Sequence, residues 1–308
     1  RLSGRCGVFL SSRGGPATRA RHDGGHLMSS MRRTSPEALF VVGGISQYLG
    51  AATAVGLFDQ VAPASVALLR VLGASLVIIG FRRSWRRAWS KQDVLWAGAF
   101  GAVLALMNLL IYLAMDRLPL GNAVAIEFLG PIAIAAIGAR NVRSAFALIL
   151  ATSGVLILVG VQNDGTLLGV VFALLAGAMW AGYIVLGHRV AQHGPAVDGL
   201  GVGMLMGAFV ISPFGIGGVG PALMSPSLLG LALATSLLSN IIPYGIDQVV
   251  MKKIARARFA LLQALLPVTA AIIGLVALGQ SPSAPECLGI GAVMLAIAVS
   301  GGERTSPR

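Results

Sequence analysis

Charged side chains are scarce in this chain. Asp, Glu, Lys and Arg together make up 11% of its 308 residues, whereas hydrophobic residues make up 56% and the mean hydropathy is +0.83. Soluble globular domains carry about 25% charged residues, so this composition excludes one. The chain is expected to lie in a membrane.

Cysteine and histidine are also rare. The two cysteines, Cys6 and Cys287, are far apart, which excludes a disulfide framework or a thiolate metal site. His188 and His193 have no acids or thiols at a ligand spacing, so we expect no metal and no cofactor. The sequence also lacks a nucleophile with its base and a phosphate-binding loop, and nothing in it argues for an enzyme.

Long apolar runs are abundant. Each has about twenty residues, the length that crosses the hydrocarbon core as a helix. We predict ten membrane-spanning helices, near residues 38–58, 63–81, 93–115, 119–139, 143–161, 166–187, 197–215, 228–250, 257–278 and 284–301. The predicted fold class is an all-α membrane protein.

The basic residues lie between these spans and not on one continuous face that could bind nucleic acid. The loops after the second, fourth, sixth and eighth spans hold Arg82, Arg83, Arg86, Arg87, Lys91, Arg140, Arg143, Arg189, Lys252, Lys253, Arg256 and Arg258. The alternate loops hold Arg117 beside Asp116, with Asp59 and Asp164 elsewhere. Because basic loops face the cytoplasm, we predict a multi-pass inner-membrane protein with both termini in the cytoplasm.

The two ends of the chain are polar. Residues 1–33 are predicted to form a basic disordered tail, and residues 302–308 a short cytoplasmic tail. The first segment lacks the apolar core of a signal peptide. Two explanations stay open for it: translation could begin at Met28 or Met31, or the tail could touch anionic lipid.

The two halves of the chain resemble each other. At an offset of 132 residues Phe40, Tyr48, Gly50 and Pro63 align with Phe172, Trp180, Gly182 and Pro195; at an offset of 136, Met115, Arg117, Glu127 and Pro131 align with Met251, Lys253, Gln263 and Pro267. We predict two five-helix repeats, over 38–161 and 166–301. Because each has an odd number of spans, the second is inverted, as in secondary transporters that bind substrate near the bilayer midplane.

Glu127 lies in the middle of the apolar run 121–136. A carboxylate inside a membrane helix is costly, so it usually faces a cavity, pairs with a cation or carries a proton. Arg70 and Asn108 lie at a similar depth, about 10 Å below the outer surface by helical rise. We expect the three side chains to meet, with an ion pair between Arg70 and Glu127. Glu127 then binds substrate or a proton, or only neutralises Arg70; Arg70 could instead clamp a substrate carboxylate.

Further side chains are candidates for the walls of a substrate cavity. They are Gln47, Tyr48, Trp180 and Tyr183, together with Gln263, which aligns with Glu127 in the repeat. Asp247 is a candidate second acid, or else an interfacial acid beside Lys252 and Lys253. The aromatic residues could equally serve to pack helices together.

Proline and glycine recur inside the spans. Pro131, Pro243 and Pro267 each remove one backbone hydrogen bond, which could serve gating or be a static packing feature. Gly199, Gly203 and Gly207 recur every four residues and predict close helix packing. Such small-residue faces would allow a homodimer without requiring one.

Four segments together resemble the EamA type of the drug/metabolite transporter superfamily, and in particular its RhtA-type threonine and homoserine exporters. The segments are PLGNAVAIEFLGP (119–131), GAMWAGYIVLGHRVAQHGPA (177–196), NIIPYGIDQVVMKKI (240–254) and VALLRVLGASLVIIGFRRSW (66–85). The resemblance covers about residues 38–301. It implies importance for Arg70, Glu127, Gly130, Pro131, Trp180, Tyr183, Pro243 and Tyr244.

The same resemblance implies proton-driven export of small amino-acid-like metabolites. Two positions depart from the family pattern: Asp247 stands where glutamate is usual, and Leu266 stands where an acid usually precedes Pro267. The second departure weakens any coupling scheme that needs that acid. We expect a proton antiporter with alternating access for substrates of the threonine and homoserine class. Export of drugs, purines or other neutral metabolites is the alternative, and a non-transporting scaffold or sensor is least favoured.

Overall fold

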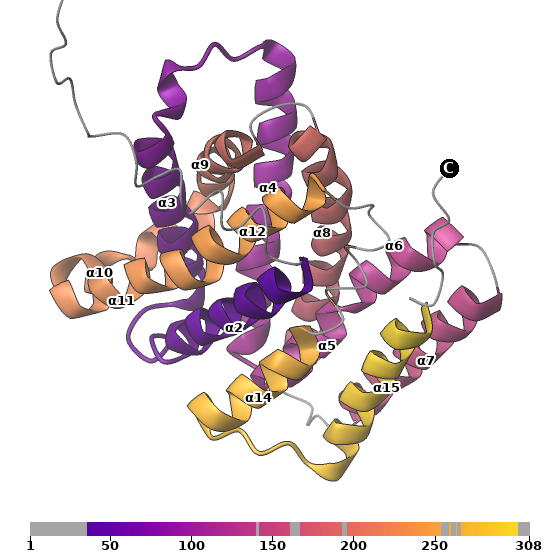
Figure 1. Cartoon of the computed structure of the whole chain (residues 1–308). Helices are drawn as coiled ribbons and strands as arrows, with labels where there is room; N and C mark the ends of the chain where they lie inside the picture. Colours follow the sequence, from indigo (N-terminus) through magenta and orange to yellow (C-terminus); the bar gives the residue numbers. More distant parts are fainter. Residues whose placement is uncertain are drawn as a thin grey trace, which may run out of the picture. The chain divides into compact units, whose positions relative to one another are not determined.

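A computed structural model describes residues 36–139, 142–160, 167–192, 196–253, 259, 263 and 266–300, and this part of the chain is helical, without a strand (Figure 1). The predicted tails at 1–33 and 302–308 lie outside these residues, as does His193.

A helix lies in each of the ten predicted segments. The helices are α2 (Pro36–Val55), α3 (Pro63–Arg82), η1 (Ser84–Arg86), α4 (Lys91–Met115), α5 (Leu120–Glu127), α6 (Leu129–Ala139), α7 (Val142–Gly160), α8 (Leu167–Gln192), α9 (Ala196–Gly215), η3 (Ile216–Gly218), α10 (Gly220–Met224), α11 (Pro226–Ser236), η4 (Leu237–Ile241), α12 (Ile242–Met251), α14 (Leu266–Leu278) and α15 (Ala284–Ser300).

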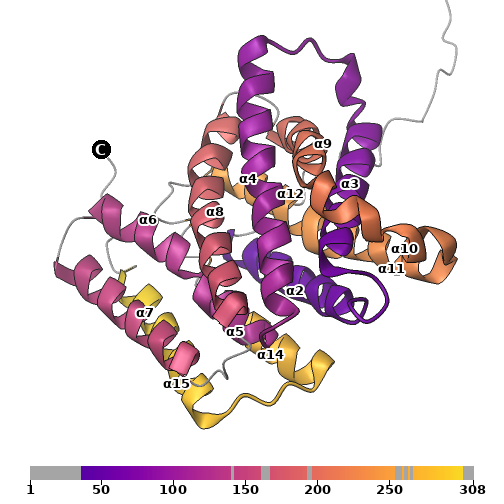
Figure 2. The ribbon, with the colours of Figure 1, turned by 180° about the vertical axis from the view of Figure 1, so that it is seen from behind.

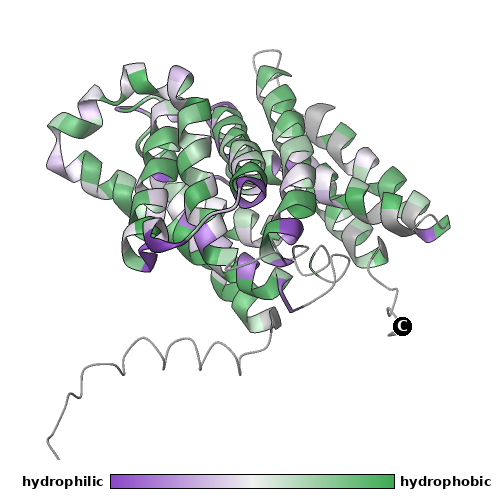
Figure 3. Ribbon diagram, turned by 90° about the horizontal axis from the view of Figure 1, so that it is seen from above, coloured by the Kyte–Doolittle hydropathy of each residue, from purple (hydrophilic) through white to green (hydrophobic). Residues whose placement is uncertain are grey.

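Six helices in the described part of the chain are long and apolar enough to cross a membrane. They run over Ala38–Val55, Pro63–Arg82, Lys91–Met115, Leu167–Gln192, Ala196–Gly218 and Pro226–Met251, and shorter apolar helices cover Leu120–Ile134, Ala145–Gly154, Thr269–Leu278 and Ala284–Ala296. Hydrophobic residues dominate most of the helical length (Figure 3). Large apolar side chains such as Phe146 and Leu156 on α7 point outward, as expected for helices that face lipid.

Proline and short polar residues set several helix ends. Pro63 is at the first turn of α3, where its missing N–H has no helical partner to lose. The helix ends at Arg83, which adopts a left-handed conformation with φ 54°. At the start of α4, Ser90 and Asp93 form a reciprocal capping box. The basic connection between α3 and α4 is therefore held at both of its ends.

The predicted span at 119–139 is not one continuous helix. It is divided at Phe128 into α5 and α6. Pro131 has no N–H, so the carbonyl group of Glu127, four residues earlier, receives no helical hydrogen bond. The break therefore falls directly after the buried carboxylate.

A second irregular segment precedes Pro243. Residues Leu237–Ile241 form a π-helical turn between α11 and α12. Wide turns of this kind free backbone groups and often occur at functional sites. Here Ser46 on α2 donates to the carbonyl of Leu238 at 2.7 Å, and Ser239 donates to the carbonyl of Gln47 at 2.9 Å. The π-helical turn is thus bonded to α2.

Small residues allow the helices to cross closely. A Cβ atom added to Gly203 would lie 2.5 Å from the Ala97 carbonyl oxygen, and one added to Gly207 or Gly101 would overlap the facing backbone. The predicted packing role of the glycines on α9 is confirmed: Gly203 and Gly207 face α4, and Gly199 faces Val190 on α8. A similar crossing joins Gly154 on α7 to α15, and these two helices lie side by side in Figures 1 and 2.

Candidate functional site

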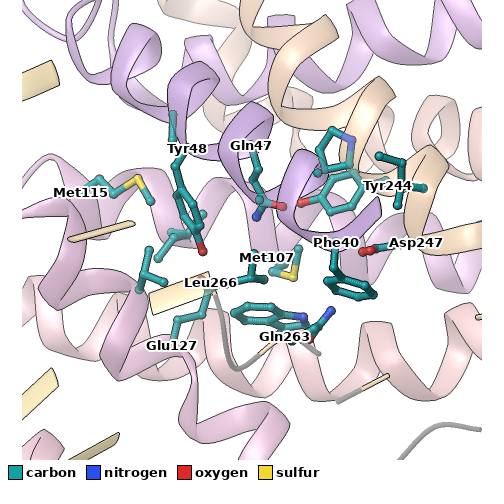
Figure 4. Close-up of a pocket in the computed structure, with 18 of the residues that line it drawn as sticks. Phe40, Gln47, Tyr48, Met107, Met115, Glu127, Tyr244, Asp247, Gln263 and Leu266 are labelled. Atoms are coloured by element: carbon teal, nitrogen blue, oxygen red, sulfur yellow. The ribbon is translucent and has the colours of Figure 1, made fainter. Parts of the chain in front are cut away.

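The candidate site is a pocket with a volume of about 40 Å³ between α2, α3, α4, α5, α8 and α12 (Figure 4). Its lining residues are Phe40, Gly43, Gly44, Gln47, Tyr48, Ala51, Arg70, Met107, Ile111, Tyr112, Met115, Val124, Glu127, Trp180, Pro243, Tyr244, Ile246, Asp247, Gln263 and Leu266. The walls are mostly apolar, and a few polar groups converge on the space, as is typical of small-molecule sites.

Arg70 is the cation of the pocket and is 3% exposed. Its Nε atom donates to Asn240 Oδ1 at 2.6 Å, and its two terminal nitrogens donate to the Tyr112 hydroxyl and to Asn108 Oδ1. The guanidinium carbon also lies 4.6 Å from the centre of the Tyr112 ring, a cation–π contact. The guanidinium is therefore fixed by neutral groups from α4 and from the π-helical turn.

The expected ion pair between Arg70 and Glu127 is wrong. Within the described residues, the ion pairs involve Arg82, Arg87 and Arg117 and none includes Arg70. The guanidinium is instead held by Asn240, Tyr112 and Asn108, which come from the π-helical turn and α4 and not from α5, and which take three of its five N–H groups. All hydrogen-bond partners of this buried cation are neutral. Its remaining N–H groups can therefore bind an anionic group that enters the pocket.

Glu127 is the carboxylate of the pocket. It ends α5, directly before the break at Phe128, and is 6% exposed. Its carboxylate makes no hydrogen bond or ion pair with any residue of the described part. The neighbouring backbone is held by α8, because a Cβ atom on Gly177 would lie 2.5 Å from the Glu127 carbonyl oxygen. The backbone at Glu127 is thus held in place by α8, while its carboxylate can bind a cation or a proton.

Asp247 is a second acid in the pocket and is 8% exposed. Its Oδ2 atom accepts a hydrogen bond from the Tyr183 hydroxyl at 2.9 Å. Among the described residues it forms no ion pair with Lys252 or Lys253, so the alternative of an interfacial acid beside the lysines is not what the structure shows. The Tyr183 ring in turn packs against Phe100 and Tyr244.

The structure brings most of the predicted candidates together. Eight line the pocket: Gln47, Tyr48, Arg70, Glu127, Trp180, Tyr244, Asp247 and Gln263. The other two lie behind the wall, where Asn108 binds Arg70 and Tyr183 binds Asp247. The Tyr244 hydroxyl also donates to Asn108 Oδ1 at 3.4 Å, which links α12 to the Arg70 cluster.

The prolines lie beside the polar groups. Pro131 follows Glu127, Pro243 lines the pocket after the π-helical turn, and Pro267 is the second residue of α14. Of the three, Pro243 lines the pocket, and Pro131 and Pro267 lie within four residues along the chain of the pocket-lining residues Glu127 and Leu266.

Sequence reasoning found one partner of Arg70, Asn108, and missed the other two. Asn240 and Tyr112 are fully or nearly fully buried polar residues in apolar runs, and both bond to the guanidinium. A signal was present for Asn240, because an asparagine three residues before Pro243 is costly in a membrane helix without a partner.

Within the described residues no group of three metal-binding side chains occurs.

Comparisons with known proteins agree with this architecture. The model of the EamA-like transporter family matches residues 167–302. The threonine/homoserine exporter RhtA of Escherichia coli K12 is 34% identical over 264 residues, which cover 85% of this chain and 89% of that protein. The exporter of the same name from Salmonella typhimurium LT2 is 34% identical over 250 residues, which cover 80% and 84%.

A solved crystal structure has the same fold. It superposes with a TM-score of 0.61 at 20% identity, covering 86% of this chain and 98% of the other. At that identity the likeness concerns the fold alone.

Proposed function

The chain belongs to the EamA-like transporter family of the drug/metabolite transporter superfamily, and from this membership we propose that it exports small zwitterionic amino acids of the threonine and homoserine class. As a member of this family it is a membrane exporter and not an enzyme, and it is a multi-pass protein of the inner membrane. The proposal concerns its substrate, its coupling and its topology.

The arrangement of charges in the pocket is the observation that supports this substrate class. Arg70 is buried among neutral partners, and the Glu127 carboxylate makes no hydrogen bond or ion pair within the described residues, yet both side chains line the same space. An amino acid carries one carboxylate and one ammonium group. In this proposal its carboxylate binds the remaining N–H groups of Arg70 and its ammonium group binds Glu127.

The size of the pocket favours a small substrate. A volume of about 40 Å³ holds only a few ordered waters before any opening motion. This supports a compact amino acid over a bulky drug or a purine. The aromatic walls formed by Tyr48, Trp180 and Tyr244 would suit a drug or a purine. A panel of competing substrates therefore distinguishes amino-acid export from export of such compounds.

For topology we propose ten spans in two inverted repeats, 38–161 and 166–301, with both termini in the cytoplasm. Helices that correspond in the two repeats pack together: α3 with α9, α5 with α14, and α7 with α15. Corresponding residues also meet at the pocket, since Glu127 pairs with Gln263 in the alignment and Tyr48 with Trp180. A pseudo-two-fold axis through the pocket would account for both observations.

For coupling we propose that Glu127 exchanges a proton for substrate during alternating access. The charged carboxylate holds the substrate ammonium group, protonation from the outer side releases it, and the returning carrier discharges the proton inside. One charge moved through 100 mV is worth about 2.3 kcal/mol, enough for a concentration ratio of about fifty.

The test is uptake of labelled threonine and homoserine into inside-out vesicles under an imposed pH gradient. Wild type is expected to accumulate both, and Glu127→Gln is expected to abolish the gradient-dependent part. Asp116→Asn is the matched control, because Asp116 is a partly exposed acid paired with Arg117 outside the pocket. Gradient-dependent uptake by an inserted Glu127→Gln protein at the wild-type level would refute the coupling scheme.

A further inference from the structure

Gln263 is a buried amide with an unused hydrogen-bonding group. It lines the pocket and is 1% exposed, and its Oε1 atom accepts no hydrogen bond from any residue that the structure describes. Buried amide groups in native proteins nearly always have a partner. Gln263 therefore has hydrogen-bonding capacity that the protein itself does not fill.

Several other polar groups of the pocket are already bonded or are assigned to the charges of the substrate. The Tyr244 hydroxyl donates to Asn108, and Asp247 accepts from Tyr183. Arg70 and Glu127 are assigned to the two charges of the substrate under the proposed function. Gln47 is only partly buried, whereas the Oε1 atom of Gln263 is buried.

Gln263 lies in the same space as the ammonium-binding carboxylate. Figure 4 draws Gln263 and Glu127 at the lower edge of the pocket. An amino acid held by its two charged groups has only its side chain left to reach another wall. The group that would satisfy a buried amide oxygen is a hydroxyl donor.

We propose that Gln263 recognises the side-chain hydroxyl of the substrate, so that the exporter selects hydroxylated amino acids over apolar ones of the same shape. This inference rests on the proposed function and specifies its substrate class. A site that is built to bond a hydroxyl rejects the analogue without it, because the buried group is then left unpaired.

Threonine and valine make the test, since they differ by a hydroxyl in place of a methyl group. The measurement is the inhibition constant of each against labelled homoserine uptake in inside-out vesicles. Wild type is expected to favour threonine over valine by about tenfold or more, the order of one net hydrogen bond. Gln263→Met keeps the length of the side chain, removes the amide, and should bring the ratio close to one.

Gln192→Met is the matched control, because it makes the same change at a glutamine of α8 that does not line the pocket. It should leave the threonine-to-valine ratio unchanged. Equal inhibition of wild type by threonine and valine would overturn the inference while leaving amino-acid export intact, and this comparison needs no variant. An unchanged ratio in inserted Gln263→Met protein would also overturn it. If inserted wild type takes up no homoserine and neither amino acid binds, the proposed function fails as well.

Discussion

At the scale of single residues, the pocket is defined by how its two opposite charges are held. Arg70 is bonded to Asn240, Tyr112 and Asn108, whereas Glu127 has no partner in the described part of the chain. An ion pair between them would have closed the site on itself. Their separation keeps a positive and a negative group available to one ligand.

The fork shape of the Arg70 guanidinium is expected to matter as much as its charge. Arg70→Lys keeps the charge but offers three donors from a single point, which cannot hold Asn240 and Tyr112 and also bind a carboxylate. We expect the KM for threonine to rise by about tenfold or more, from the loss of charge-assisted hydrogen bonds. Initial rates of uptake in inside-out vesicles measure this.

Arg117→Lys provides the comparison, because Arg117 is partly exposed and is paired with Asp116 away from the pocket. It should leave the KM unchanged. A wild-type KM in an inserted Arg70→Lys protein would mean that Arg70 packs the helices and binds no substrate carboxylate.

At the scale of helices, the sequence located the elements and the prolines near their irregular stretches, but not the form that those stretches take. The apolar runs predicted where helices lie because helix length in a membrane is set by the hydrocarbon thickness. The division at Phe128 and the π-helical turn at Leu237–Ile241 depend on how backbone groups released near Pro131 and Pro243 find other partners. The partners of these backbone groups come from distant segments. A local sequence pattern could therefore not predict the form of the irregular stretches.

The partners of Arg70 show the same limit. Asn240 lies 170 residues away along the chain, and it meets Arg70 only because the π-helical turn packs against α3. An isolated arginine in an apolar run predicts that a partner exists. It does not predict whether the partner is an acid or an amide, and this is why the expected ion pair with Glu127 was wrong.

The crossing of α6 and α8 is expected to be intolerant of any side chain. A Cβ atom on Gly130 would overlap the Gly177 carbonyl oxygen, so Gly130→Ala must push apart two backbones beside Glu127. We expect a loss of about 1–3 kcal/mol of stability, the usual cost of overpacking. Thermal unfolding of the detergent-purified protein measures it.

Gly230→Ala is the control, since an added Cβ atom there meets nothing within 4 Å and Gly230 also lies inside a helix, α11. It should be neutral or slightly stabilising, because alanine favours helix more than glycine does. Equal unfolding temperatures for the two variants would show that α6 and α8 can accept an added methyl group at their crossing without loss of stability.

At the scale of the whole molecule, the inverted repeat would explain why one pocket contains both an acid and an amide. Glu127 and Gln263 occupy corresponding positions of the two halves and line the same space. A symmetric pair of acids would repel each other and would bind two cations. With glutamine at one of these two corresponding positions, the pair offers one carboxylate for the ammonium group and one neutral amide for a different part of the substrate.

The proposed topology puts the connection between α14 and α15 outside the cell. Cys287, an exposed free cysteine in the first turn of α15, reports on that side directly. In a Cys6→Ser background we expect Cys287 to react with a membrane-impermeant maleimide added to intact spheroplasts. In a cysteine-free background, Arg86→Cys in the basic α3–α4 connection should react only in inside-out vesicles, because basic loops face the cytoplasm. Labelling of both positions from the same side would contradict the topology, since three proposed spans of the first repeat and four of the second lie between them, an odd number of crossings.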